Sequence, residues 1–318
     1  MLWVGIDEAG YGPNLGPLVM TAVIAEGPDD HPPDPWLDLA ATVSRVGGPA
    51  GSLWVDDSKR VFHARQGRPR LDAACLAAVA SGAPGTTRPA SFGSLLAAVG
   101  AGSLDAVELA PWLAPGSDPP VATEGPGFPS SVDPFAGASW RIVAVRSAVV
   151  GPARFNAGID ATGSKASVHF AAFAGLLAKV WRRLGPDRPA TVVSDKHGGR
   201  HFYADPLRSA FPSARVHRGV EGPELSAYTL TSDDPERRLD LRLLPRADAG
   251  HGLVAIASVV SKSIRERWMD AFNAHWLALI PGLKPTAGYP VDAARFRAAI
   301  EPICLERGRP PATWWRSR

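Results

Sequence analysis

The sequence is poor in cysteine and has no long apolar run, and both absences limit what the protein can be. Of its 318 residues only two are cysteines, Cys75 and Cys304, which lie far apart in the chain. They supply neither the clustered ligands of a zinc site nor a disulfide framework, so we expect two reduced thiols. No stretch approaches the roughly 20 apolar residues of a membrane-spanning helix. The opening MLWVGIDEAG also lacks the basic and apolar regions of a secretion signal. We therefore expect a cytoplasmic protein with no membrane partner.

Charged residues are sparse too, at 20% of the chain, and their signs nearly balance. Hydrophobic residues make up 45%, which is ordinary for a globular protein and excludes wholesale disorder. The formal net charge of +3 is compatible with a polyanionic partner without implying one. Length alone permits one large domain or two smaller ones. We expect a single domain over residues 1–318.

Apolar runs and their periodicity predict an α/β chain. The runs LWVGID and LGPLVMTAVIAE predict two strands, and the Gly/Pro/Asn-rich AGYGPNLG between them suits the tight connection of an antiparallel hairpin. RIVAVRSAVVG and ATVVSD predict further strands, and residues 213–244 predict a hairpin-like stretch. Helices are expected at residues 71–80, 91–99, 165–184, 253–276 and 291–307, with a short one after ATVVSD. Residues 82–139 are dense in Gly, Pro, Ser and Ala, which predicts an insertion or a lid on one edge.

Two of the predicted strands end on an acid, Asp7 and Asp195. Strand ends in an open α/β sheet are where active sites collect, although a lone acid there is more often a turn residue or a helix cap. Clustered carboxylates repel one another and are tolerated mainly when a cation neutralises them. Hard ions such as Mg²⁺ take oxygen ligands, and two such ions can activate a water and stabilise the leaving oxygen in phosphodiester hydrolysis. The acids therefore indicate phosphoryl chemistry.

The run GIDEAGYGPNLGPLV resembles the opening of ribonuclease HII, in which an Asp-Glu pair leaves the first strand and a Gly-x-Gly loop follows. Further segments resemble the same family in the same order, namely DDSKR, TVVSDKHGG, RADAGHGLVAIASVVSKSIRERWM, AGYPVDAARF and the closing TWWRSR. The resemblance covers roughly residues 1–60 and 140–318. It implies a ribonuclease H-like fold: a mixed sheet that starts with an antiparallel hairpin, with helices on both faces and a helical C-terminal part.

The resemblance also implies a function and its residues. The activity would be metal-dependent endonucleolytic hydrolysis of the RNA strand of an RNA/DNA hybrid or a ribonucleotide-containing duplex, with Mg²⁺ or Mn²⁺ as cofactor and no obligate protein partner. The catalytic, metal-binding carboxylates would be Asp7, Glu8, Asp195 and Asp248. The substrate would meet the backbone of Gly10, Tyr11 and Gly12 near its ribose, Lys59 and Lys262 at its phosphates, and Tyr289 as a stacking ring.

The chain departs from the family pattern at two places. The family's Gly-Arg-Gly is Gly-Tyr-Gly here, and Lys196 stands where a glycine usually follows the third carboxylate. Lys196 and Arg200 thus become candidate substrate-binding residues, and His197 is either a proton shuttle or an exposed turn residue. Two alternatives follow: a nuclease of the same superfamily acting on branched DNA or structured RNA, or a non-catalytic hybrid-binding module.

Some residues have rival interpretations. Glu221 and Glu224 compete with Asp248 as the fourth carboxylate, and Asp248 is preferred because the helix after it matches the family. The ring series Trp268, Phe272 and Trp276 recurs at helical spacing, which is typical of a core face.

The sequence also leads to an expected location for two further groups of charged or aromatic residues. Arg265, Glu266 and Arg267 are expected on a solvated or salt-bridged helix face. The closing Trp314, Trp315, Arg316 and Arg318 either grip nucleic acid or pack on the body of the protein.

Overall fold

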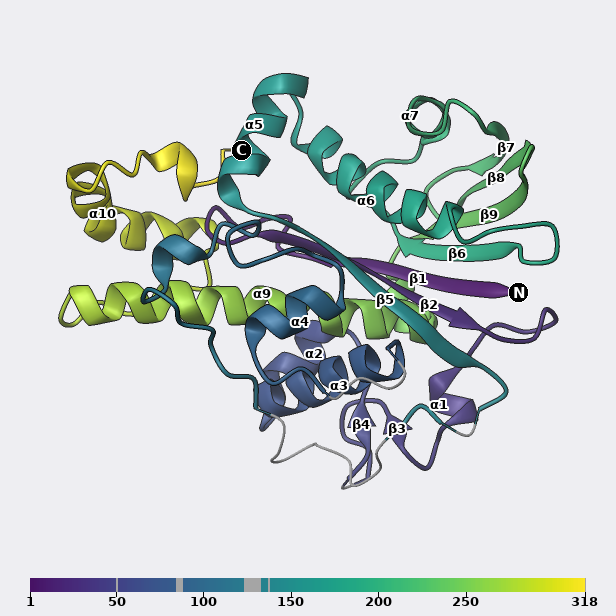
Figure 1. Cartoon of the computed structure of the whole chain (residues 1–318), viewed down its shortest axis with the longest axis horizontal. Helices are drawn as coiled ribbons and strands as arrows, with labels where there is room; N and C mark the ends of the chain where they lie inside the picture. The colour runs from purple at the N-terminus through teal and green to yellow at the C-terminus, as the bar shows by residue number, and fades with distance from the viewer. Residues whose placement is uncertain (50, 84–87, 123–132, 137, 318) are drawn as a thin grey trace.

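The computed structural model describes residues 1–49, 51–83, 88–122, 133–136 and 138–317 (Figure 1). Its main sheet has seven strands in the order β5-β2-β1-β6-β9-β8-β7. These strands are β1 (Leu2–Ala9), β2 (Leu18–Glu26), β5 (Arg141–Val150), β6 (Ala190–Asp195), β7 (Arg215–Glu221), β8 (Ser226–Asp233) and β9 (Glu236–Leu244). A separate pair is formed by β3 (Val43–Ser44) and β4 (Leu53–Trp54).

The main sheet is mixed. β1 pairs antiparallel with β2, which confirms the predicted hairpin, and parallel with β6, which is in turn parallel to β9. Residues 213–244, expected as a hairpin-like stretch, instead form the three strands β7, β8 and β9. The extra strand has a physical role, because it returns the chain to the centre of the sheet beside β6 and gives β6 a partner on its second side.

Helices cover both faces of the sheet, and an apolar core lies between each face and the helices that cover it. The helices are α1 (Pro35–Asp38), α2 (Ser58–His63), α3 (Gly67–Ser81), α4 (Phe92–Ala98), α5 (Pro152–Thr162), α6 (Lys165–Trp181), α7 (Ala204–Ala210), α8 (Ala247–Gly250), α9 (Gly252–Leu279) and α10 (Pro290–Glu306), with short 3-10 turns at Ala110–Trp112 and Pro311–Thr313. Figure 1 shows α6 on one side of the sheet and α9 with α3 on the other. Leu176 and Val192 belong to the first core, and Val23 and Trp268 to the second. The predicted α/β class with helices on both faces is confirmed.

The long helix α9 lies directly on β1. A side chain at Gly5 of β1 would overlap the backbone of Leu253, so the absence of a side chain permits this close packing. Trp268, Phe272 and Trp276 of α9 are fully buried, which confirms them as core residues. None of the described helices is long and apolar enough to cross a membrane.

The described part of the segment at residues 82–139 packs against this second core. α4 confirms the helix expected at residues 91–99, and Ser91 caps it by accepting the backbone N–H of Ser94. Trp268 of α9 donates to the Val107 carbonyl oxygen at 3.1 Å. Phe92, Leu95, Val107, Leu109 and Trp112 are buried together with residues of α3 and α9. Residues 84–87, 123–132 and 137 of the expected insertion lie outside the described residues.

Candidate active site

The acids that end the strands meet at one edge of the sheet. Ile6 of β1 pairs in parallel register with Ser194 of β6, so the next residues, Asp7 and Asp195, leave neighbouring strands side by side. β9 ends next to Asp195 on the other side, and α8 follows it with Asp248 in its first turn. The backbone N–H of Ala247 donates to Asp195 Oδ1 at 3.2 Å, which ties α8 to the end of β6.

Asp7 is the most buried of these acids, with 7% of its surface exposed. Burial raises the pKa of its carboxyl well above the ordinary value, and the negative charge of Glu8 raises it further. Asp248 and Asp195 add to this rise, while a hydrogen bond from Ser258 lowers the pKa and only partly opposes it. The ionised form of Asp7 is therefore disfavoured by its protein surroundings.

Asp195 and Asp248 show the same pattern. Burial is the largest cause of the raised pKa of Asp195, and Glu8 contributes repulsion. Burial raises the pKa of Asp248 to about 6, with repulsion from Asp57 and Asp195, while Lys59 acts in the opposite direction. The acids thus lie within electrostatic reach of one another.

This donor set fits a hard divalent cation in its chemistry. Every candidate ligand is a carboxylate, the ligand type that Mg²⁺ and Mn²⁺ prefer, and a cation would offset the mutual repulsion described above. Among the described residues, no three His, Cys, Asp or Glu side chains are grouped closely enough to hold a metal ion. Mg²⁺ is commonly bound through one or two carboxylates, with waters and substrate phosphates as its other ligands, so a closed protein cage is not required.

A buried chain of hydroxyl groups fixes the end of β1. Ser261 of α9 donates to the Asp7 carbonyl oxygen at 3.1 Å and lies 2.8 Å from Thr21 Oγ1. Thr21 of β2 in turn lies 2.9 Å from Ser147 of β5. Because these hydrogen-bonded hydroxyl groups join three strands to α9, they hold the backbone at Asp7 in place.

The side chain of Glu8 faces a histidine that the sequence analysis missed. His169 of α6 places Nε2 3.5 Å from Glu8 Oε1 and is 1% exposed. Its ring contacts those of Tyr11 and His197 at centroid distances of 4.6 and 4.5 Å. No motif marks His169, because it comes from a helix far from Glu8 in the sequence. The expectation of an exposed His197 is wrong, since this ring is buried, and burial with the neighbouring His169 lowers its pKa well below the ordinary value.

The two glycines of the Gly-Tyr-Gly loop differ in what the fold requires of them. Gly10 has a φ of +90°, and an added Cβ would overlap the Pro17 carbonyl oxygen and lie 2.7 Å from Arg265 Nε. An added Cβ at Gly12 would meet nothing within 4 Å. The packing of the protein therefore demands glycine at position 10 only, and the space beside Gly12 is open.

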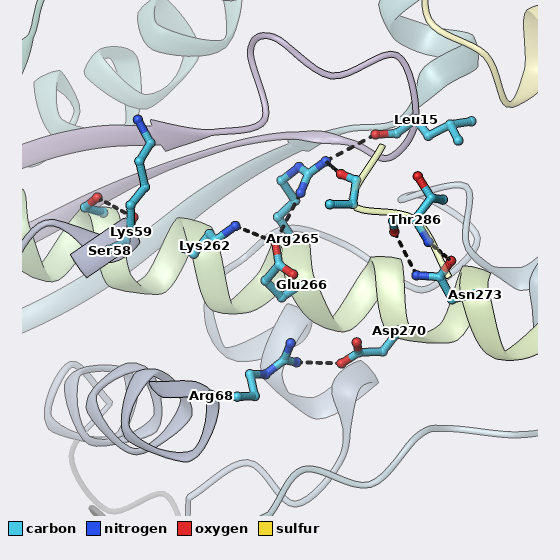
Figure 2. Close-up of polar contacts among 12 residues, drawn as sticks. Leu15, Ser58, Lys59, Arg68, Lys262, Arg265, Glu266, Asp270, Asn273 and Thr286 are labelled. Atoms are coloured by element: carbon cyan, nitrogen blue, oxygen red, sulfur yellow. Dashed lines mark hydrogen bonds and ion pairs between the residues drawn. The ribbon is translucent and has the colours of Figure 1, made fainter. Parts of the chain in front are cut away.

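Two buried arginines support this loop. Arg265 of α9 is 1% exposed and donates to the Leu15 carbonyl oxygen at 3.3 Å and the Ala287 carbonyl oxygen at 2.9 Å (Figure 2). Arg316, also 1% exposed, donates to the carbonyl oxygens of Gly10 and Tyr11. The closing segment is thus packed on the body of the protein as far as the structure describes it, and Arg318 lies outside the described residues.

The face of α9 expected to be solvated or salt-bridged is salt-bridged and largely buried. Glu266 is 8% exposed and accepts from Lys262 Nζ at 2.6 Å and from Arg265 Nη1 at 3.1 Å (Figure 2). Arg267 pairs with Asp72 of α3 at 2.9 Å. The solvated reading is wrong because α3 and the loop after β1 cover this face.

Two other predicted substrate residues, Tyr289 and Arg200, lie in different parts of the fold. Tyr289, at the start of α10, is 47% exposed and follows Gly288, whose carbonyl oxygen accepts from Asn14 of the loop. Arg200 lies with its guanidinium 5.5 Å from the centre of the Phe170 ring.

Lys196 is not arranged for a phosphate. It is 8% exposed, and its Nζ donates to the Gly222 carbonyl oxygen at 2.6 Å and to Ser226 Oγ at 2.8 Å. These bonds hold it against the turn between β7 and β8, so we leave it out of the proposed site.

Of the two rival acids, Glu224 is exposed and Glu221 is engaged elsewhere. Glu221 accepts the Tyr228 hydroxyl and lies 3.7 Å from Arg218. Its charge is not among those that raise the pKa of Asp7, whereas that of Asp248 is. The geometry therefore favours Asp248 as the fourth acid.

No family model matches the sequence, and neither does any curated protein. Solved structures are similar in fold. A chain of the PCNA:RNase HII complex from Archaeoglobus fulgidus aligns over 100% of this chain and 95% of its own, with 14% identity and a TM-score of 0.44. The ribonuclease H2 from Pyrococcus horikoshii OT3 aligns over 99% and 92%, with 14% identity and a TM-score of 0.46. Bst-RNase HIII in complex with Mn²⁺ aligns over 99% of this chain and 66% of its own, with 15% identity and a TM-score of 0.48. At these values the likenesses carry no residue role over to this chain. The structure does show the arrangement expected from the motifs, a mixed sheet that starts with a hairpin and has helices on both faces.

Proposed function

We propose that this chain is a divalent-metal-dependent endonuclease that hydrolyses the RNA strand of RNA/DNA hybrids. The observation that carries the proposal is the placement of Asp7 and Asp195 at the ends of neighbouring parallel strands, with Asp248 beside them. All three carboxyls have raised pKa values that repulsion from neighbouring acids helps to cause. A cost of this kind is typical of a functional site rather than of a structural one.

Within this function the acids would share one task. Asp7 and Asp195 would bind the metal directly, and Glu8 and Asp248 would complete the set. Bound Mg²⁺ or Mn²⁺ supplies activation of a water and stabilisation of the leaving oxygen in phosphodiester hydrolysis. The hydroxyl chain from Ser261 would keep the backbone of Asp7 in place.

Recognition of ribose would fall to the loop after β1. The open space at Gly12 lets a sugar approach the backbone closely, and Tyr289 is exposed next to this loop. Lys59 would face a phosphate at the other side of the acids, since its charge reaches Asp248.

The test uses three labelled duplexes: an RNA/DNA hybrid, DNA containing a single ribonucleotide, and all-DNA. Each is incubated with the purified protein and Mg²⁺, Mn²⁺ or chelator, in parallel with Asp7→Asn. Metal-dependent cutting of ribose-containing strands by the wild type alone is expected. Cutting of the all-DNA duplex would support a nuclease with another substrate. Metal-independent binding without any cutting would support a binding module.

A further inference from the structure

Arg316 is a buried cation without an acidic partner. It is 1% exposed, and among the described residues no carboxylate pairs with it. Its guanidinium lies 3.8 Å from the centre of the Phe155 ring and donates only to the carbonyl oxygens of Gly10 and Tyr11. Burial lowers the pKa of Arg316 to about 9, which leaves the group protonated at neutral pH. Burying an unpaired charge is costly, so a role beyond packing is expected of it.

The two carbonyl groups that Arg316 binds determine where two amides point. The only cis peptide bond among the described residues is Asp234–Pro235, so the peptide bonds on either side of Tyr11 are trans. In a trans peptide the N–H points opposite to the C=O. The N–H groups of Tyr11 and Gly12 therefore point away from Arg316.

Both amides are available for an outside acceptor. Within the described residues, neither the Tyr11 N–H nor the Gly12 N–H donates a hydrogen bond. They follow Glu8 after Ala9 and Gly10, and an added Cβ at Gly12 would meet nothing within 4 Å. A cation bound to the carbonyl side of a peptide polarises the peptide and strengthens its N–H as a donor.

We infer that Arg316 is a positioning residue that aims and polarises the amides of Tyr11 and Gly12 toward an oxygen of the RNA strand. The inference rests on the proposed function for the nature of the ligand, which is a ribose hydroxyl or a phosphate oxygen. The loop has a tyrosine at its centre and no cation of its own, and the positive charge bonded to the carbonyl oxygens of Gly10 and Tyr11 comes from Arg316 in the closing segment.

The backbone around Arg316 is anchored independently of its guanidinium. Its N–H donates to the Asn14 carbonyl oxygen at 2.8 Å, and its carbonyl oxygen accepts from Asn14 Nδ2 at 3.1 Å. Asn156 of α5 donates to the Trp315 carbonyl oxygen at 2.8 Å. A change of the Arg316 side chain therefore leaves the segment attached to the loop and to α5.

The test compares Arg316→Lys and Arg316→Met with Arg309→Lys. Arg309 is a matched control, because it belongs to the same segment, donates to the Pro111 carbonyl oxygen at 2.9 Å and lies over the Trp112 ring. The chain has four tyrosines, so ¹⁵N-tyrosine labelling gives four backbone amide signals, and Tyr11→Phe identifies that of Tyr11. Without substrate, the Tyr11 amide signal should move upfield in both Arg316 variants and stay in place in Arg309→Lys.

Affinity for the hybrid and for all-DNA duplex is then measured in chelator, and cleavage kinetics in Mg²⁺. Arg316→Met should weaken hybrid binding about tenfold and raise KM more than it lowers kcat. A loss for the hybrid alone identifies a ribose hydroxyl, and an equal loss for both duplexes identifies a phosphate oxygen. An unmoved Tyr11 signal, or unchanged affinity in a folded Arg316→Met protein, overturns the inference. A wild type that binds no hybrid refutes the proposed function instead, and the amide signal still decides whether Arg316 polarises the loop.

Discussion

Asp7 is an acid whose ionised form the fold disfavours. Burial and three neighbouring acids raise the pKa of its carboxyl, and the Ser258 hydrogen bond opposes them only in part. If Asp7 were retained for stability, its surroundings would be expected to stabilise its charged form. The surroundings of Asp7 do the reverse, which is typical of a group held for chemistry.

Replacing Asp7 with Asn should therefore stabilise the metal-free protein. In the presence of a chelator we expect the free energy of unfolding to rise by about 1 kcal/mol. The substitution removes a buried negative charge that neighbouring acids repel. Urea denaturation measures this change, and cleavage should be lost in the same variant. The exposed Asp105 gives the control Asp105→Asn, for which neither quantity should change. Clear destabilisation of Asp7→Asn would show that this acid supports the fold.

The two loop glycines should respond differently to alanine. Gly10→Ala should destabilise the protein by about 1–3 kcal/mol, because its φ of +90° and its contacts exclude a side chain. Gly12→Ala should unfold like the wild type and yet raise KM for the hybrid about tenfold by filling the open space. Thermal unfolding and steady-state kinetics measure the two effects. Equal kinetics for Gly12→Ala and wild type would remove this loop from the substrate site.

Among the elements, α9 joins the core to the loop through its buried charges. Glu266 compensates Arg265, whose pKa burial lowers and the charge of Glu266 raises. Glu266→Gln keeps the shape of the side chain but removes its charge, and we expect a loss of about 3 kcal/mol. The partly exposed pair Arg297–Glu301 on α10 has the same four-residue spacing as the pair of Glu266 with Lys262. Glu301→Gln should leave the urea midpoint unchanged, and similar midpoints for both variants would contradict a buried pair.

The elements with long periodic patterns could be predicted from the sequence. β1, β2, β6 and α9 all lie where apolar runs and helical spacing place them. α5 was missed because PARFNAGIDAT has a glycine and an asparagine inside it and no clear apolar stripe, so its helix depends on packing against α6 and the closing segment. The third strand of residues 213–244 was missed because its partner, β6, is distant in the chain.

The residues of the candidate site also divide into those that the sequence predicts and those that it does not. The acids could be predicted because they stand at strand ends within motifs, and parallel pairing then brings Asp7 beside Asp195. His169 could not, because it comes from a helix with no sequence pattern that marks it, and for Arg316 the sequence left open whether it grips nucleic acid or packs on the body. Lys196 was misplaced because a neighbouring position in sequence does not fix which way a long side chain turns.

At the scale of the whole molecule, both thiols report on the integrity of the core. Cys75 and Cys304 are fully buried, and burial raises the pKa of Cys75 to about 12 and that of Cys304 to about 11. Almost no thiolate is present at pH 8, so a thiol reagent should label neither cysteine until urea unfolds the protein. Mass spectrometry of labelled peptides distinguishes the two sites. Labelling of Cys75 in the native protein would show that α3 opens locally.

Metal binding should stabilise the whole chain through the acids at the sheet edge. A ligand that binds only the folded state at 100 times its Kd adds about 2.7 kcal/mol to the free energy of unfolding. Mg²⁺ should therefore raise the Tm of the wild type, and the rise should be much smaller in Asp195→Asn. Asp105→Asn serves again as the control with an intact site. The same rise in all three proteins would place the bound metal elsewhere.

The hydrogen bond from Asn14 to the Arg316 carbonyl oxygen joins residues 302 positions apart. Closing a loop of that size costs chain entropy that a local hairpin does not, and contacts of such long range are slow to form. The hairpin of β1 and β2 can therefore form early in folding, while the loop that connects these two strands is fixed only when the far end of the chain docks on it. A folding chain would therefore place Asp7 and Glu8 first, would add Asp195 and Asp248 when β6 and α8 join β1, and would order the loop after β1 last. The contact between Asn14 and Arg316 would be among the first to break when the protein begins to unfold.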